Sequence, residues 1–214
     1  CSWNFDSWEG LVYSETRRRA AEYLNEYSRK YRTAEIDSWF YRIPARGDVE
    51  EYRDRVDEGF RFTCKVPRDL TRPEEDTFLS PELFGSFLEA VDPLLPQIDA
   101  VMFEFAYLNK KKMPSLEAFI EKFEAFLSPV PDGLPYAVET RNGNYLKPPY
   151  FEFLRRNTLI HVFSEKQYMP RICELYPRIK PYLGGSTVIR LLGGDRKEIE
   201  EKTNHDVVAF IKNV

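Results

Sequence analysis

Ala100-Val101-Met102-Phe103-Glu104-Phe105 is an apolar run with the length of a β-strand and a single charge inside it. Further along, Ser115–Leu127 carries apolar side chains three or four positions apart, which is typical of an amphipathic helix. A second apolar run, Tyr136–Thr140, comes next. Two such runs separated by a helix predict two parallel strands joined by a crossover connection.

The same alternation extends along the whole chain. Strands are predicted at 33–37, 60–66, 100–106, 136–140, 159–163 and 187–191, and helices at 14–31, 49–56, 81 to about 93, 115–127, 149–156, 169–176 and 195–202. Ser14, Ser80 and Ser115 are predicted N-caps of three of these helices. Because a helix separates each strand from the next, we expect one domain over residues 1–214, built on a parallel sheet that helices cover.

Each of the six apolar runs contains a charged residue, and this pattern indicates a shared polar pocket. The charges are Glu35 with Asp37, Lys65, Glu104, Glu139 with Arg141, Glu165, and Arg190. Burying one unpaired charge costs several kcal/mol, so six strands with charges in similar places are not explained by packing alone. The sequence has no G-x-G-x-x-G after its first visible strand and no P-loop motif, so the doubly wound nucleotide-binding fold lacks its usual support. In a (β/α)₈ barrel every strand end reaches one mouth, and the spread of charges therefore favours the barrel.

Composition sets further bounds. The chain has 214 residues, a net charge of −4, 43% hydrophobic and 31% charged residues. The negative charge does not favour nucleic-acid binding, and no apolar stretch is long enough to predict a membrane span. Three scattered cysteines fit neither a disulfide framework nor a metal site, so we expect a reduced, cytoplasmic protein. The sequence begins with Cys1, and we expect some N-terminal residues to be missing from it.

Five segments resemble the motifs of the DUF72 (YecE-like) family, in the same order. They are Ser2–Gly10, Ala34–Pro44, Gly59–Arg68, Val138–Asn142 and Val188–Gly193. The resemblance implies a TIM-type (β/α) barrel with seven βα units, in which the first strand ends just ahead of these motifs and the eighth strand is missing from this sequence. The activity of this family is not established, so the resemblance implies a fold and not a mechanism.

Three residues depart from the family pattern. Asp37 and Glu104 stand where the family usually has Asn and Gln, and each adds an acid to the expected site. Leu192 stands where the family tends to have His. The first two changes make the site of this chain more acidic than the pattern implies.

Four carboxylates are the candidate catalytic residues: Glu35, Asp37, Glu104 and Glu139. Glu35 and Asp37 lie two apart and face the same way, which suits an acid/base pair or a cation site as well as a structural ion-pair network. Glu104 lies between two phenylalanines, and apolar surroundings raise the pKa of a carboxyl group. Glu139 repeats the two-residue spacing with Arg141, and such a pair either positions a substrate or joins neighbouring strands.

Six residues are the candidate substrate-binding residues: Lys65, Arg141, Arg190, Trp3, Tyr41 and Asn142. The three cations suit an anionic group. Trp3 and Tyr41 belong either to the core or to a stacking platform near the site. Asn142 is assigned through the motif that resembles the family pattern. His161 is expected to be a core histidine rather than a catalytic one.

These residues predict a site for a small polar or anionic substrate, such as a sugar, a sugar phosphate or a phosphodiester. If the protein is an enzyme, we expect a hydrolase or an isomerase that uses carboxylate acid/base chemistry. The alternative is a non-catalytic protein that binds a small anion or single-stranded nucleic acid. A Mg²⁺ or Mn²⁺ ion held by carboxylates is compatible with this set, whereas a multi-zinc site needs several histidines and the chain has two.

Overall fold

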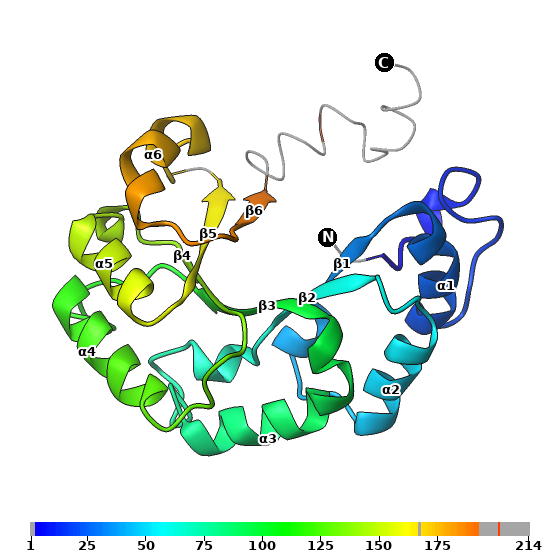
Figure 1. Ribbon diagram of the computed structural model, residues 1–214, viewed down its shortest axis with the longest axis horizontal. Helices are drawn as coiled ribbons and strands as arrows, with labels where there is room; N and C mark the ends of the chain where they lie inside the picture. The colour runs from blue at the N-terminus through cyan, green and yellow to red at the C-terminus, as the bar shows by residue number, and fades with distance from the viewer. Residues whose placement is uncertain (1–2, 167, 193–200, 202–214) are drawn as a thin grey trace.

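The computed structural model describes residues 3–166, 168–192 and 201, and these form a single curled parallel sheet with helices around it. The strands pair in chain order and are β1 (Thr33–Ile36), β2 (Arg61–Lys65), β3 (Ile98–Phe105), β4 (Tyr136–Thr140), β5 (Ile160–Glu165) and β6 (Val188–Leu191). All neighbouring pairs are parallel. Figure 1 shows that the sheet curls into an open half-barrel, with β1 and β6 on either side of the opening.

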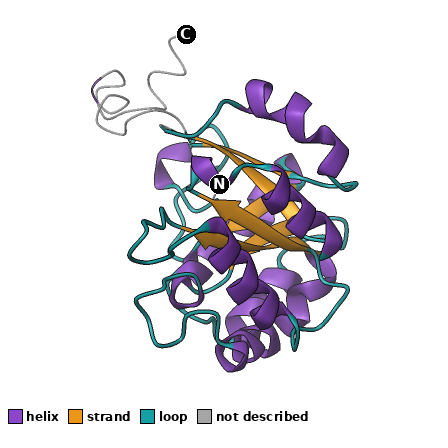
Figure 2. Ribbon diagram, turned by 90° about the vertical axis from the view of Figure 1, so that its left-hand side faces the viewer, coloured by secondary structure: helices purple, strands orange, loops and turns teal. Residues whose placement is uncertain are grey.

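In the described part of the chain, six α-helices lie on the convex side of this half-barrel (Figure 1). They are α1 (Ala20–Lys30), α2 (Arg46–Asp54), α3 (Pro81–Val91), α4 (Leu116–Leu127), α5 (Pro148–Arg156) and α6 (Ile172–Ile179). The view from the side in Figure 2 shows the strands running together with helices packed against them. None of the helices in the described part of the chain is long and apolar enough to cross a bilayer.

Local sequence explains where the two longest apolar helices begin. The Ser80 hydroxyl accepts a hydrogen bond from the Leu83 amide at 3.1 Å, and Pro81 occupies the first turn of α3. At the start of α4, the Ser115 hydroxyl accepts from the Ala118 amide at 3.2 Å. Each serine satisfies an amide that has no partner within the helix, so the two predicted caps are confirmed.

Two helices begin later than the sequence predicts. α1 starts at Ala20 rather than Ser14, because the Ser14 amide donates to the Glu26 carboxylate at 2.8 Å and so ties Ser14 to the side of the helix. α6 starts at Ile172 rather than Met169. The Ile172 amide donates to the Glu165 carboxylate at 3.1 Å, so this acid from the end of β5 acts as the cap of α6.

The two faces of the sheet have separate apolar cores. The larger core, which we call the outer core, lies between the sheet and the helices and contains a dense set of aromatic rings, among them Phe84, Phe103 and Phe123. A much smaller cluster of Ala100, Met102, Ala137 and Val162 lies on the concave face. Because successive strand residues point to opposite faces, residues two positions beyond this cluster also face inward.

The α/β fold with parallel strands is confirmed, but the described residues form a six-stranded half-barrel and not a ring of seven βα units. The first strand expected ahead of Ser2 lies outside the described residues. Apart from residue 201, the helix expected at 195–202 also lies outside them. The six strands that are described agree with the six apolar runs, with ends that differ by a few residues.

Candidate functional site

Seven charged side chains gather on the concave face near the carboxyl ends of the strands, and we call them the charge cluster. They are Glu35, Asp37, Lys65, Glu104, Glu139, Arg141 and Arg190. Five strands supply them or are directly followed by them. The four carboxylates outnumber the three cations by one, and every member lies within 4.0 Å of an opposite charge.

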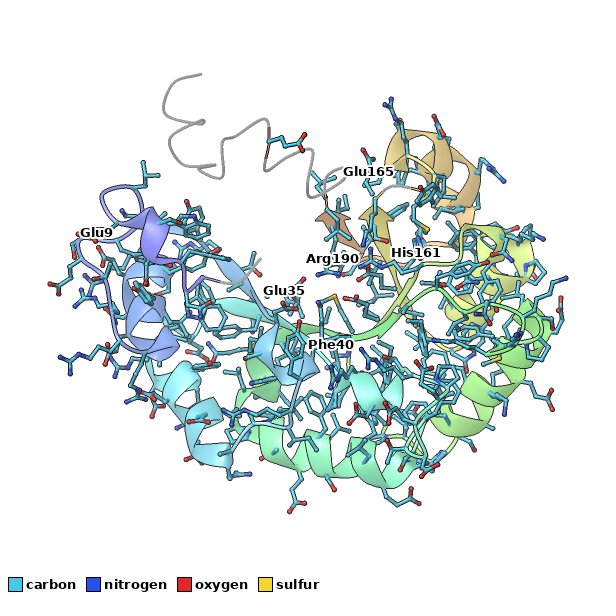
Figure 3. All side chains as sticks on the ribbon, turned by 180° about the vertical axis from the view of Figure 1, so that it is seen from behind. Glu9, Glu35, Phe40, His161, Glu165 and Arg190 are labelled. Carbon is cyan, nitrogen blue, oxygen red and sulfur yellow. The ribbon has the colours of Figure 1, made fainter. Side chains whose placement is uncertain are left out.

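Arg190 of β6 joins the two ends of the open sheet. Its Nε and Nη2 donate to the two oxygens of Glu35 on β1 at 3.0 and 2.9 Å, which is a bidentate pair. Its Nη1 donates to Glu139 at 2.6 Å. Figure 3 shows Arg190 and Glu35 opposite one another on the inner side of the half-barrel. Since β1 and β6 do not pair in the sheet, this contact crosses the opening between them.

Lys65 ends β2 and lies deep in the charge cluster, with its side chain only 8% exposed. Its Nζ lies 2.5 Å from Asp37 and 2.9 Å from Glu104. The ring of Phe40 lies 5.1 Å from the same nitrogen, in cation–π geometry. Lys65 therefore has two close carboxylates and an aromatic face that together offset the cost of its burial.

Glu104 and Glu139 are neighbours across β3 and β4, where their Cα atoms are register partners. Arg141 connects the two carboxylates, since its Nη2 lies 3.3 Å from Glu104 and 2.7 Å from Glu139. Glu139 has no exposed surface, whereas the Glu104 side chain is 18% exposed. Of these two acids, only Glu104 is accessible to a ligand.

The surroundings move the pKa values of these two acids in opposite directions. Burial raises the pKa of Glu139 above its ordinary value, and the nearby Arg190 and Arg141 offset this only in part. Burial acts on Glu104 in the same sense, but Lys65, Arg141 and Arg190 together outweigh it and hold its pKa below the ordinary value. Divergent pKa values suit separate acid and base roles, but only Glu104 of this pair is accessible to a ligand.

Lys65 and Arg190 of the charge cluster are held in their charged forms. Burial would lower the pKa of the Lys65 amine, but Asp37 and Glu104 outweigh it and raise the pKa above its usual range. Burial acts on Arg190 in the same way, and its carboxylate partners again raise its pKa. Both side chains are therefore charged at neutral pH.

A cavity of about 500 Å³ opens beside Glu104, and we call it the mouth cavity. Its walls are Glu104, Ala106, Tyr107, Arg141, Lys166, Tyr168 and Met169. These residues lie at or just beyond the carboxyl ends of β3, β4 and β5. A second cavity of about 560 Å³ shares Tyr107, Arg141 and Tyr168 with it and adds Lys147 and Arg178. A third cavity, of about 650 Å³, lies at the opposite ends of the strands, beside residues 133–136 and 182–186, away from the charge cluster.

The structure brings seven of the ten predicted site residues together and leaves three apart. Trp3 is buried in the outer core, where its ring nitrogen donates to the Ala20 carbonyl at 2.7 Å. Tyr41 is 66% exposed, and the Arg68 guanidinium lies over its ring. Asn142 is the third, and none of Trp3, Tyr41 and Asn142 lines the mouth cavity.

Asn142 supports the site from behind. Its side chain accepts from the Leu108 amide at 2.8 Å and donates to the Leu108 carbonyl at 2.9 Å. These two bonds hold the segment after β3 against the segment after β4. Asn142 is therefore a positioning residue for Tyr107 and Arg141, the wall residues adjacent to it and to Leu108.

The fifth apolar run does not contribute to the charge cluster. Glu165 caps α6 instead. His161 is buried among the rings of Tyr150, Phe151 and Phe163, and burial lowers the pKa of its imidazole to about 3. It belongs to the outer core, as the sequence predicts.

No group of three or more His, Cys, Asp or Glu side chains in the described part of the chain is arranged to hold a metal ion. The carboxylates of the charge cluster face cationic side chains instead. Among these residues, no such cluster supports the carboxylate Mg²⁺ or Mn²⁺ site that the sequence leaves open.

The predicted site residues do not include five residues of the mouth cavity: Ala106, Tyr107, Lys166, Tyr168 and Met169. All of them lie at the end of a predicted strand or in the segment that leads from it to the first residue of the next predicted helix, and that position is the signal that could have found them. No alternation of apolar and charged residues marks these positions in the sequence.

Comparisons with known proteins agree with this fold. UPF0759 protein YecE of Escherichia coli K12 is 24% identical over 123 residues, which is 57% of this chain and 42% of that protein. A DUF72 family protein of Enterococcus faecalis V583 has a TM-score of 0.59 at 19% identity, and covers 91% of this chain and 94% of its own. One from Thermotoga maritima MSB8 has a TM-score of 0.56 at 20% identity, over 78% and 64% of the two chains.

The family assignment follows from a match along nearly the full sequence. The chain spans less than half the length of YecE, and the solved structures are similar in fold alone at these identities. The family described as "Protein of unknown function DUF72" matches residues 1–213. This chain therefore belongs to the DUF72 family.

Proposed function

We propose that the mouth cavity binds a small molecule that carries hydroxyl groups and an anionic group, the chemistry of a sugar phosphate, and that Glu104 is the carboxylate that acts on it. One observation carries this proposal: Glu104 belongs both to the charge cluster and to the wall of the cavity. It is held ionised and partly exposed, so it can accept a hydrogen bond from a ligand hydroxyl group.

The other walls of the cavity suit the same ligand. Arg141 and Lys166 supply positive charge for an anionic group. Tyr107 and Tyr168 offer aromatic faces, on which the apolar side of a sugar ring can pack. The cavity lies at the carboxyl ends of parallel strands, which is where barrel proteins carry their ligand sites.

We also propose that the half-barrel is part of a TIM-type (β/α) barrel. The support is the curvature of the sheet, which brings Arg190 of β6 within hydrogen-bond distance of Glu35 of β1.

The free thiols of Cys64 and Cys173 are consistent with a reducing, cytoplasmic compartment.

If the protein is catalytic, a hydrolase or isomerase mechanism with Glu104 as the base fits this geometry. Glu139 is fully buried and would act through Arg141 and Arg190 rather than on the ligand. One observation favours a second candidate, binding without turnover: each of the three cations already has a carboxylate partner other than Glu104. A network so fully paired is also what a purely structural or binding role requires.

The test is a panel of neutral sugars, sugar phosphates and a phosphodiester, measured by calorimetry and by product analysis. We expect a sugar phosphate to bind, and Tyr107→Ala to weaken its binding at least tenfold. Tyr31→Ala is the matched control, because Tyr31 is also an exposed tyrosine but does not line the cavity. Loss of turnover with retained binding in Glu104→Gln supports catalysis. If no panel compound binds, or if both tyrosine variants bind alike, the proposal is wrong.

A further inference from the structure

The Glu104 carboxylate is surrounded by three cations that lie on or just beyond three different strands. Its Oε2 lies 2.9 Å from Lys65 Nζ on β2 and 3.1 Å from Arg190 Nη1 on β6. Its Oε1 lies 3.3 Å from Arg141 Nη2, just beyond β4. Charged donors that converge in this way on one pair of oxygens are the usual protein environment of a bound oxyanion. We call these three residues the three-cation site.

Each cation of this site also has a carboxylate of its own. Lys65 contacts Asp37 at 2.5 Å, Arg141 contacts Glu139 at 2.7 Å, and Arg190 holds Glu35 through two hydrogen bonds. Without Glu104, three cations would face three carboxylates, and every pair would remain complete. The charge cluster therefore does not depend on Glu104 to neutralise its buried cations.

Two further features connect the three-cation site to a ligand. Glu104 and Arg141 both line the mouth cavity, so the site is reached from that cavity as soon as the Glu104 side chain moves. Arg141 also keeps Nη1 buried with no hydrogen-bond acceptor among the described residues. A buried donor without an acceptor costs free energy, and an incoming oxygen atom would remove that cost.

We infer that Lys65, Arg141 and Arg190 form an oxyanion site that Glu104 fills in the free protein, and that the carboxylate or phosphate group of a ligand takes the place of Glu104. The inference deepens the proposed function, since it rests on the same cavity and names the group of the ligand that is recognised. Glu104 then has two positions. In the free protein it fills the site, and in the complex it is released toward the ligand, where it can accept a proton.

The experiment is rescue of a truncated side chain by a free anion. Glu104→Ala and Glu104→Gln are melted in sodium formate, acetate and phosphate, with sodium chloride at matched ionic strength as the reference. We expect both variants to melt below the wild type. Formate, acetate or phosphate should then raise the midpoint of Glu104→Ala along a saturable curve, with an apparent dissociation constant at least tenfold lower than for the wild type.

Asp37→Asn is the matched control, because it removes the same charge from the same cluster but frees only one contact, with Lys65. We expect its response to these anions to stay within threefold of the wild type. An equal gain in Asp37→Asn would show that net charge alone is at work and would overturn the inference. So would a folded Glu104→Ala that responds no more to these anions than to chloride.

The folding of the variants is itself informative. If Glu104→Ala folds only when formate, acetate or phosphate is present, the inference is supported. If neither Glu104 variant folds in any anion, the site requires its own carboxylate and the inference fails. Failure of the sugar phosphate panel on the wild type leaves this result unchanged, so the two proposals fail separately.

Discussion

His161 is a buried titratable group that lies outside the charge cluster. Both of its ring nitrogens lack hydrogen-bond partners among the described residues, and burial holds its pKa at about 3. A folded-state pKa below the ordinary value of about 6.5 means that the unfolded chain takes up a proton first as the pH falls. The unfolding free energy is therefore unaffected by His161 above pH 6.5, and it decreases as the pH falls below that value.

We expect His161→Phe to remove this sensitivity to acid. Between pH 6.5 and 4 the wild type should lose about 1.4 kcal/mol of unfolding free energy per pH unit from this one group, and the variant should not. Phenylalanine suits the site because Phe151, Phe163 and Tyr150 already surround it. Urea unfolding across this pH range measures the difference. Equal slopes for the two proteins would contradict the prediction.

Glu104 makes a second contribution that depends on pH, in a lower window. Its folded-state pKa is held below the ordinary value, because three cations outweigh the effect of burial. The stability that it adds is complete above the unfolded pKa of about 4.3, and is lost as the pH falls through the lower folded value. We expect Glu104→Gln to be less stable than the wild type at pH 7, with a gap that narrows below pH 4.3. A gap that stays constant from pH 7 to 3 would show that Glu104 is not held ionised.

At the scale of single elements, α6 depends on a residue that lies outside it. The Ile172 amide donates to the Glu165 carboxylate at 3.1 Å, and Arg171 at the N-cap position makes no side-chain cap. We expect Glu165→Ala to cost about 1 kcal/mol of unfolding free energy, as the loss of a cap does elsewhere. Glu152→Ala, in an exposed position on α5, is the control and should cost much less. Equal losses in chemical denaturation would refute a capping role for Glu165.

The elements also show how far local sequence predicts structure. The apolar spacing in Ser115–Leu127 and the serine ahead of it predict α4 to within a residue, because cap and periodicity both act within one turn. The start of α1 was predicted too early, since Ser14 bonds to Glu26 across the helix face. The start of α6 was missed for a similar reason: its cap comes from the preceding strand. Local sequence patterns mispredict the start of a helix where the bonds that define it come from a side chain outside the first turn of that helix.

For the whole molecule, Arg190 is the contact that joins the two ends of the half-barrel. It bonds Glu35 on β1 through two hydrogen bonds, although β1 and β6 are not paired strands. We expect Arg190→Met to cost about 3–5 kcal/mol, because it leaves three carboxylates in the charge cluster without their shared cation. Hydrogen exchange should become faster in β1 and β6 before it does in β3 and β4.

The matched control is Arg156→Met, which breaks the ion pair between Arg156 and Glu124 on the helical surface. Both side chains are exposed there, so the loss should stay within about 1 kcal/mol. If Arg190→Met costs no more than this control, the contact across the opening does not stabilise the half-barrel. Uniform changes in hydrogen exchange would likewise count against a local role at β1 and β6.

The sequence predicts six strands, the helices between them and the inward charges, because alternation along a strand decides locally which face each residue takes. It does not predict which charges meet. Arg190 and Glu35 are 155 residues apart, and they meet because the sheet curls. The same curvature places Glu104 among three cations and leaves Trp3 in the outer core. Contacts between distant strands depend on how the whole sheet bends, and no local pattern of residues specifies that bend.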